Sequence, residues 1–235
     1  MEIIIMENAA EIGEAAGKLF VEAIQKKPDI VLGLATGASP VPTYQYISAA
    51  CQKGEVSLRD VRTYNLDEYV GLPRNDKNSY YTFMHEQLFN HTDIQEQNVH
   101  FLDGNATDVE AECRSYDDQL DKAHIDIQLL GIGRNGHIGF NEPSDSFPPV
   151  VHTVQLTEST IQANSRLFER VEDVPTQAIT MGVGTILKAE RILLIAGADK
   201  RYILEEALTG RVTPQVPASV LQLHRDVTVI VCREE

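Results

Sequence analysis

The stretch from Gly131 to Pro143, GIGRNGHIGFNEP, concentrates side chains that could move protons. Histidine is the residue type whose ordinary pKa lies closest to neutrality, so His137 could both accept and donate a proton at pH 7. Asn135 and Glu142 bracket it, and an amide or carboxylate partner can fix the tautomer of an imidazole and tune its pKa. The glycines allow the backbone to turn sharply and to approach a ligand closely. The stretch therefore predicts a general acid–base loop, with a structural histidine as the alternative.

Gly131, Gly133 and Gly136 also match the GxGxxG pattern of dinucleotide-binding folds. That pattern requires a helix to begin within it, so that the pyrophosphate rests on the helix N-terminus. Here the sequence continues as HIGFNEP, in which glycine and proline disfavour a helix. We therefore expect neither a nicotinamide nor a flavin site.

A second candidate is NLDEYVGLP, in which Asp67 and Glu68 follow a predicted strand. Neighbouring side chains of an extended chain point to opposite sides, so we expect no more than one of the two carboxylates to face a site. Asp67 could act as a base there. The alternative is a loop carboxylate that accepts hydrogen bonds from nearby backbone N–H groups.

The segment 35–40, ATGASP, joins a predicted strand to a predicted helix. Free backbone N–H groups at such a turn and the helix dipole favour a bound anion, and the hydroxyls of Thr36 and Ser39 add donors. The GxxxxGK[ST] phosphate loop is absent. The alternative is an ordinary turn in which Ser39 is the N-cap of the helix.

Two cations are candidates for the same anion. Arg166 and Lys200 are by default solvated surface charges. Lys200 follows a predicted strand at a predicted helix start, so it could reach the edge where ATGASP lies and contribute charge to a phosphate.

These candidates need a scaffold that gathers loops from distant parts of the chain. Apolar runs predict strands at 2–6, 30–34, 61–66, 98–102, 125–130, 150–156, 178–181, 191–196 and 227–232. Helical periodicity predicts helices at 9–26, 41–53, 79–89, 108–122, 159–168, 184–188, 200–208 and 218–223. This alternation predicts one domain, 1–235, with a doubly wound α/β fold: a mainly parallel, Rossmann-like open sheet with helices on both faces. Ligands of such sheets bind beyond the carboxyl ends of the strands, so the loops at Thr36, Asp67 and His137 should meet.

The net charge of the chain narrows the range of expected binding partners. The 235 residues contain 20 Lys and Arg against 35 Asp and Glu, a net charge of −15, which argues against nucleic acid and anionic membranes. Cys51, Cys113 and Cys232 lie far apart, and no metal-ligand spacing occurs, so a reducing cytoplasm fits. The acidic N-terminal stretch resembles neither a signal peptide nor a membrane span.

Four stretches make nearly the whole chain resemble the glucosamine-6-phosphate deaminase family. They are TYNLDEYVGLP (63–73), GIGRNGHIGFNEP (131–143), ANSRLF (163–168) and MGVGTIL (181–187). The related 6-phosphogluconolactonases share the fold and the phosphate loop, but in them the histidine precedes a TASLFP-like sequence. Here 138–143 reads IGFNEP, which favours the deaminases.

The resemblance implies that glucosamine 6-phosphate and water give fructose 6-phosphate and ammonia, without cofactor or metal. His137 would match the acid–base residue that opens the sugar ring, with Asn135 and Glu142 as the residues that orient and tune it. Asp67 would match the base that moves a proton from C2 to C1 through an enolamine. The implied phosphate contacts are Thr36, Gly37, Ala38, Ser39, Arg166 and Lys200.

The chain departs from some family members in three ways. Asn135 stands where some carry Asp, and an amide cannot stabilise an imidazolium by charge. Positions that hold basic residues of an activator site in larger, hexameric members read His152, Val154 and Gln155, and the sequence stops at Glu235 without their C-terminal extension. We therefore expect an enzyme without an allosteric activator site, as a monomer or small homo-oligomer.

Two other functions stay open from the sequence. One is a lactonase of the 6-phosphogluconolactonase type. The other is a non-catalytic phosphosugar sensor, which should lack some of Asp67, His137 and Glu142 and carry a basic DNA-binding segment. The chain has all three residues and no such segment.

Overall fold

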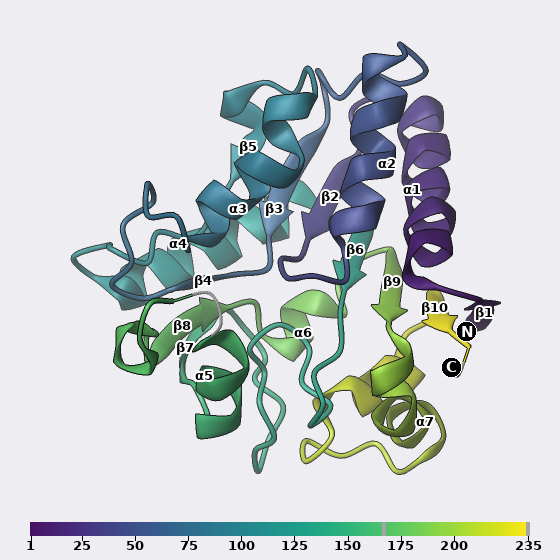
Figure 1. Cartoon of the computed structure of the whole chain (residues 1–235). Coiled ribbons are helices and arrows are strands. Elements are labelled where there is room, and N and C mark those ends of the chain that lie inside the picture. The colour runs from purple at the N-terminus through teal and green to yellow at the C-terminus, as the bar shows by residue number, and fades with distance from the viewer. Residues whose placement is uncertain (166–167, 234–235) are drawn as a thin grey trace.

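The computed structural model describes residues 1–165 and 168–233, and Figure 1 shows their arrangement around a central parallel sheet. Its seven strands all run in one direction. In order across the sheet they are β1 (Glu2–Met6), β10 (Val227–Cys232), β9 (Arg191–Ala196), β6 (Ile127–Leu130), β2 (Val31–Leu34), β3 (Arg62–Asn65) and β5 (Val99–His100). The predicted mainly parallel sheet is confirmed.

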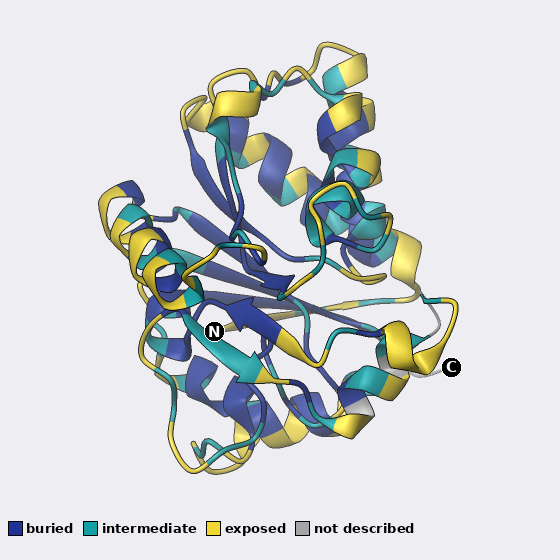
Figure 2. Cartoon of the chain, turned by 90° about the vertical axis from the view of Figure 1, so that its left-hand side faces the viewer, coloured by how far each residue is buried: buried dark blue, intermediate teal, exposed yellow. Residues whose placement is uncertain are grey.

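Helices cover both faces of this sheet. The helices α1 (Ala9–Lys26), α2 (Val41–Gln52) and α3 (Tyr80–Gln87) pack on one face. On the other face lie α4 (Val109–Ala123), α6 (Val183–Ile186), α7 (Arg201–Thr209) and the 3-10 helix Pro217–Leu223. Figure 2 shows that the central strands are buried, with exposed positions on the outer sides of the helices. The doubly wound arrangement is therefore confirmed.

Local sequence explains why these elements form. A strand covered on both faces needs apolar side chains on both, and β9 (RILLIA) is almost continuously apolar and buried. In α1, the Asn8 side chain accepts a hydrogen bond from the Glu11 amide and caps the first turn, as the sequence favours. Phe20 of α1 is fully buried in the core, where truncation to alanine typically costs about 3–5 kcal/mol.

A second, small sheet was not predicted. It consists of β4 (Asp67–Tyr69), β8 (Gln177–Thr180) and β7 (His152–Gln155), paired antiparallel in the order β4-β8-β7. The sequence indicated strands near β7 and β8, but as members of the main sheet, and it indicated a loop at β4. Strands of three or four residues have little pattern of their own, and their pairing is fixed only by the tertiary structure.

Leu66 lies at the junction of the two sheets. Its amide donates to the carbonyl of Leu34 at the end of β2 (2.9 Å), and its own carbonyl accepts from the Met181 amide after β8 (2.9 Å). The next residue is Asp67. The chain thus leaves the main sheet and enters the small one within a single residue.

The helix α5 (Glu158–Asn164) lies beside the small sheet (Figure 1). The predicted helix at 159–168 extends over 166–167, which lie outside the described residues. In α5, Ile161 packs against a satellite cluster built on Tyr69, Phe140 and Leu156. Across the described residues, none of the helices has the length and apolar character needed to cross a bilayer.

Candidate active site

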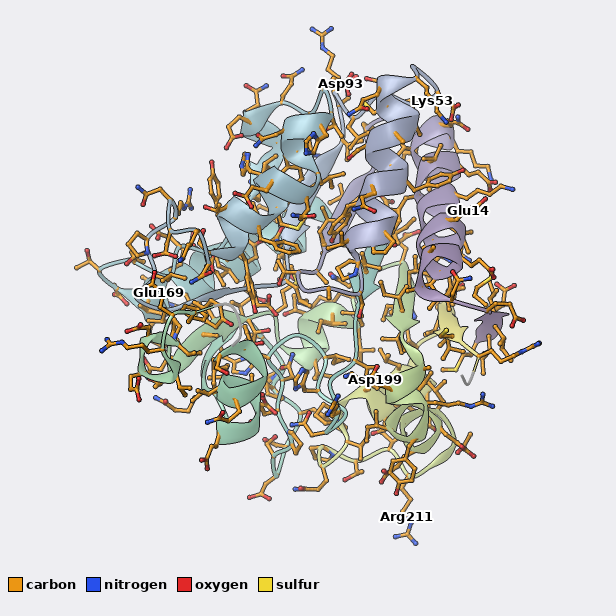
Figure 3. The ribbon with its side chains drawn as sticks, viewed as in Figure 1. Glu14, Lys53, Asp93, Glu169, Asp199 and Arg211 are labelled. Carbon is orange, nitrogen blue, oxygen red and sulfur yellow. The ribbon has the colours of Figure 1, made fainter. Side chains whose placement is uncertain are left out.

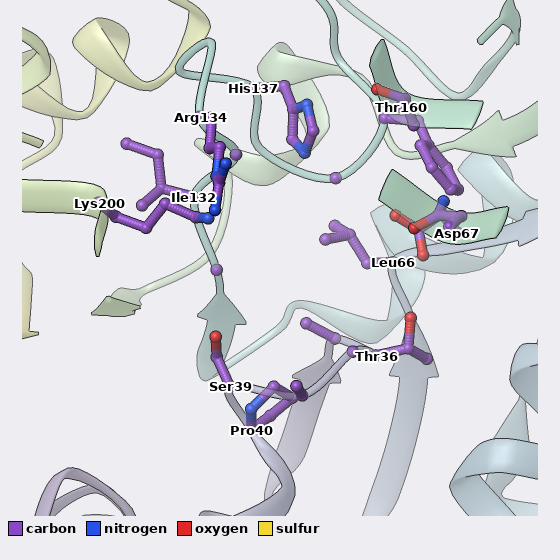
Figure 4. A pocket seen from close by; sticks show the side chains of 18 of the residues that line it. Thr36, Ser39, Pro40, Leu66, Asp67, Ile132, Arg134, His137, Thr160 and Lys200 are labelled. Carbon is purple, nitrogen blue, oxygen red and sulfur yellow. The ribbon is translucent and has the colours of Figure 1, made fainter. Parts of the chain in front are cut away.

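The loops that follow four neighbouring strands enclose a pocket of about 460 Å³. The strands are β9, β6, β2 and β3, and the pocket lies where the chain order reverses between β6 and β2, the point at which open α/β sheets bind ligands. Figure 4 shows Arg134 and Lys200 on one side, Asp67 and Thr160 on the other, and His137 between them. Among the lining residues are Thr36, Gly37, Ala38, Ser39, Leu66, Asp67, Tyr80, Arg134, Asn135, His137, Thr160, Asn164 and Lys200.

The His137 loop has a backbone that needs its glycines. Gly136 and Gly139 adopt positive φ angles of 82° and 57°, which other residues rarely adopt. A Cβ atom on Gly133 would lie 2.3 Å from the His137 ring, so this glycine makes room for the imidazole. No helix occurs between 131 and 151, all of them described residues, so the expectation that no helix begins within the GxGxxG stretch is confirmed.

Asn141 fixes the loop from behind. Its side-chain amide is buried and donates to the carbonyls of Ile138 and Met181, both at 2.8 Å. The Phe140 amide donates to the Thr180 hydroxyl at 3.1 Å. The loop is therefore attached to the end of β8, and the small sheet supports the position of His137.

Glu142 lies behind His137 at the centre of a hydrogen-bond network. Its Oε2 accepts from the Asn135 amide at 2.5 Å and lies 3.5 Å from His137 Nδ1. Its Oε1 accepts from the hydroxyl of Thr160, with the Thr157 hydroxyl 3.4 Å away. His137 Nδ1 is buried and makes no closer hydrogen bond within the described residues, which leaves Nε2 as the ring nitrogen for a ligand.

These contacts decide the charge of Glu142. Burial by itself favours the neutral acid, but the His137 ring and the hydrogen bonds from Thr160 and Asn135 favour the carboxylate and lower its pKa to about 2. Glu142 is thus an anion at neutral pH. An anion 3.5 Å from Nδ1 favours the tautomer that carries its proton on Nδ1 and keeps the lone pair on Nε2.

Asp67 has the opposite environment. It begins β4 and is buried in the pocket wall, and this burial, together with the neighbouring Glu68 carboxylate, raises its pKa to about 8. Glu68 does not line the pocket. Its carboxylate accepts from the amides of Tyr69, Tyr80 and Tyr81 at 2.8, 3.1 and 3.0 Å, and so joins β4 to the start of α3.

The segment 35–40 turns between β2 and α2 with Gly37 at a φ of 101°. The N-cap of α2 is Pro40, not Ser39, and within the described residues no side chain caps the first turn. The alternative in which Ser39 caps the helix is therefore wrong. Thr36, Gly37, Ala38 and Ser39 all line the pocket, at a helix N-terminus that favours an anion.

Lys200 approaches the pocket from the end of the 3-10 helix Ala198–Lys200, and its Nζ lies 2.8 Å from Asp199 Oδ2. Arg134 reaches the same carboxylate oxygen at 3.5 Å. In Figure 3, Asp199 lies between α7 and the His137 loop, whereas Lys53 and Arg211 extend away from the molecule. The predicted contact Arg166 lies outside the described residues.

Sequence reasoning missed four polar side chains of the pocket: Tyr80, Arg134, Thr160 and Asn164. Arg134 could have been found, because it stands inside the motif that carries His137. Thr160 and Asn164 are one helical turn apart and therefore share a face of α5, but nothing in the sequence shows what that face covers.

A metal site is not apparent in the described residues, which contain no cluster of three or more His, Cys, Asp and Glu side chains that could hold an ion.

A comparison with protein families decides the relationship. The sequence model described as "Glucosamine-6-phosphate isomerases/6-phosphogluconolactonase" matches residues 6–230. The chain belongs to this family. Within it, the proteins named glucosamine-6-phosphate deaminase from Lachnoclostridium phytofermentans and Thermoanaerobacter sp. (strain X514) are 49% and 47% identical to the chain. These matches cover all of the chain and 100% and 93% of the two relatives. The predicted resemblance is confirmed.

Solved structures agree. A structure described as a monomeric glucosamine-6-phosphate deaminase superposes with a TM-score of 0.96 at 45% identity, over 100% of this chain and 98% of that one. A 6-phosphogluconolactonase from Leishmania guyanensis gives a TM-score of 0.77 at 20% identity, over 98% and 96% of the chains. The second match shows a shared fold only.

Proposed function

We propose that this protein is a glucosamine-6-phosphate deaminase, which converts glucosamine 6-phosphate and water to fructose 6-phosphate and ammonia. The observation that carries the proposal is one pocket in which a buried carboxyl group, an oriented histidine and a cationic, amide-rich end lie together. The relatives with this name are 45–49% identical, whereas the lactonase match is 20% identical. The lactonase and sensor functions are therefore the weaker alternatives.

The phosphate of the substrate would bind at the cationic end. The uncapped start of α2, the hydroxyls of Thr36 and Ser39 and the ammonium of Lys200 face the same space. Backbone amides at a helix N-terminus and a nearby ammonium are suited to a dianion. Anchored there, the sugar ring would extend toward His137 and Asp67.

His137 would act as the acid–base group in ring opening. Its Nε2 lone pair would accept the proton of the anomeric hydroxyl, and the imidazolium would return a proton to the ring oxygen as the C1–O5 bond breaks. Glu142 stabilises the transient imidazolium and holds the Nδ1 proton in place. The net result is the open-chain aldehyde with no change in protonation of the protein.

Asp67 would act as the base in the isomerisation. Its carboxylate would remove the C2 proton while the aldehyde oxygen takes up a proton from the substrate ammonium, which gives an enolamine, and would then return the C2 proton to C1. The resulting C2 imine adds water and releases ammonia. In the free protein the Asp67 pKa of about 8 keeps much of this group protonated at pH 7. The ammonium of the bound substrate, adjacent to C2, would favour the ionised form.

We also propose a monomeric cytoplasmic enzyme without an activator site. β7 presents His152, Val154 and Gln155 at the positions that hold basic activator-site residues in larger, hexameric members. Further support comes from the structural relative described as monomeric. The three cysteines are free thiols, as a reducing compartment favours.

The test is to incubate the protein with millimolar glucosamine 6-phosphate and to measure ammonia and fructose 6-phosphate. Equimolar release of both is expected. Hydrolysis of 6-phosphogluconolactone without ammonia release from the amino sugar would support the lactonase instead. Binding of either sugar phosphate without turnover would support the sensor.

A further inference from the structure

Thr160 contacts the Glu142–His137 pair from outside the loop that carries it. Its side chain is buried, lines the pocket, and donates a hydrogen bond to Glu142 Oε1. The other oxygen of the carboxylate, Oε2, is the one that faces His137 Nδ1. The two ends of the carboxylate are thus held by different elements, Oε1 by α5 and Oε2 by the loop.

The helix α5 is itself fixed at two points on the side that carries Thr160. Thr157, the N-cap, accepts from the Thr160 amide at 3.3 Å and lies 3.1 Å from its hydroxyl, which fixes the start of the helix. One turn later, Asn164 donates to the Tyr69 hydroxyl of β4 at 2.8 Å. The position of the Thr160 hydroxyl is therefore determined by contacts of α5 with the small sheet and with Glu142.

We propose that Thr160 is a positioning residue that holds the Glu142 carboxylate in the rotation in which Oε2 faces His137. The inference rests on the proposed function, in which Glu142 orients that histidine. A carboxylate rotates easily about its last side-chain bond, and Asn135 alone, bonded to Oε2, does not fix Oε1. The Thr160 hydroxyl supplies the second fixed point.

The groups around Glu142 make the prediction specific. His137 is the titratable side chain that faces it, while Asn135, Thr157 and Thr160 present uncharged donors. The other ionisable side chains that line the pocket are Asp67, Tyr80, Arg134 and Lys200. Loss of the Thr160 hydrogen bond must therefore raise the Glu142 pKa, because that bond stabilises the charged carboxylate.

The test replaces Thr160 by Val, which keeps the shape and removes the hydroxyl. Carbon-13 NMR titration of Glu142 should show its pKa raised by about 1–2 units, since a hydrogen bond to a charged group is worth roughly 1.5–3 kcal/mol. Turnover of glucosamine 6-phosphate should fall about tenfold with little change in KM. Thr160→Ser, which retains the hydroxyl, should restore both values.

Thr185→Val is the matched control. Thr185 of α6 is also buried and donates to a carboxylate, Asp117, at 2.8 Å, but it does not line the pocket. This variant should leave the Glu142 pKa and the turnover unchanged. An unchanged Glu142 pKa in Thr160→Val, or the same shift in Thr185→Val, would overturn the inference. The titration needs no substrate, so it decides the role of Thr160 even if the proposed reaction is not observed.

Discussion

Asp67 and Glu142 are two carboxyl groups of the candidate active site with similar burial, 5% and 8% exposed. Their pKa values move in opposite directions, to about 8 for Asp67 and to about 2 for Glu142. Burial, together with the Glu68 carboxylate, raises the pKa of Asp67, whereas at Glu142 an imidazole and several hydrogen-bond donors outweigh the effect of burial. The charge of a buried acid thus depends on whether donors and charges within reach offset its burial.

The contrast supports the different tasks that we propose for the two groups. A carboxyl group with a pKa near the working pH can both take and return a proton, as the C2-to-C1 transfer requires. A carboxylate that stays ionised at every physiological pH cannot exchange protons usefully, but it orients a neighbouring histidine well. The following substitutions test this division, from the largest expected effect to the smallest.

Asp67→Asn removes the exchangeable proton and nearly preserves the shape. Turnover should fall by about 10²–10⁴-fold, and exchange of the C2 proton of the substrate with deuterium oxide should cease. The raised Asp67 pKa means that its stability penalty is absent below about pH 4 and builds as the pH rises to about 8. The variant should therefore melt at a higher temperature than the wild type above pH 8. Wild-type exchange rates would remove Asp67 from its proposed role.

Glu142→Gln should change stability with the opposite sign. A lowered pKa stabilises the fold above the unfolded value near 4.5, and this contribution disappears as the pH falls toward 2. The free energy of unfolding at pH 7 should drop by on the order of 3 kcal/mol, and the difference from the wild type should shrink in urea titrations at pH 3. We expect turnover to fall about 10–100-fold. If both variants shifted stability in the same direction, the contrast between the two acids would not hold.

Asn135→Asp should make the surroundings of Glu142 resemble those of Asp67. A second carboxylate would replace the amide that now lies 2.5 Å from Oε2, and like charges at that distance titrate as a pair with one raised pKa. Turnover at pH 7 should change by no more than about threefold, while the acidic limb of the pH–rate profile moves upward. A profile that superposes on that of the wild type would show that the amide and the acid act alike.

Local sequence pattern was sufficient for the main sheet and for the meeting of the candidate loops. Periodicity identifies β9 because its residues are almost continuously buried, and α1 because its buried residues recur at helical spacing on one face. Parallel topology places the loops after β2, β3 and β6 at one edge. The resemblance motifs supplied the roles of Asp67 and His137, which remain to be tested.

The sequence could not give the features that depend on distant contacts. Three-residue β4 has no pattern that separates it from a loop, and only its pairing with β8 makes it a strand. The pKa values of Asp67 and Glu142 diverge because folding buries Asp67 and brings hydrogen-bond donors to Glu142, such as Thr160, 18 residues away along the chain. The sequence alone therefore does not predict which of the two carboxyl groups has the raised pKa.

The backbone of Leu66 has a consequence for the spacing of the candidate site. Its amide donates to the last residue of β2, and it directly precedes Asp67, so the loop proposed for the phosphate and the residue proposed as the base start from neighbouring, hydrogen-bonded strands. The distance between the backbones of these two segments is therefore set by the sheet. The main chain at Leu66 thus holds the proposed anion site and the proposed base at a constant backbone spacing.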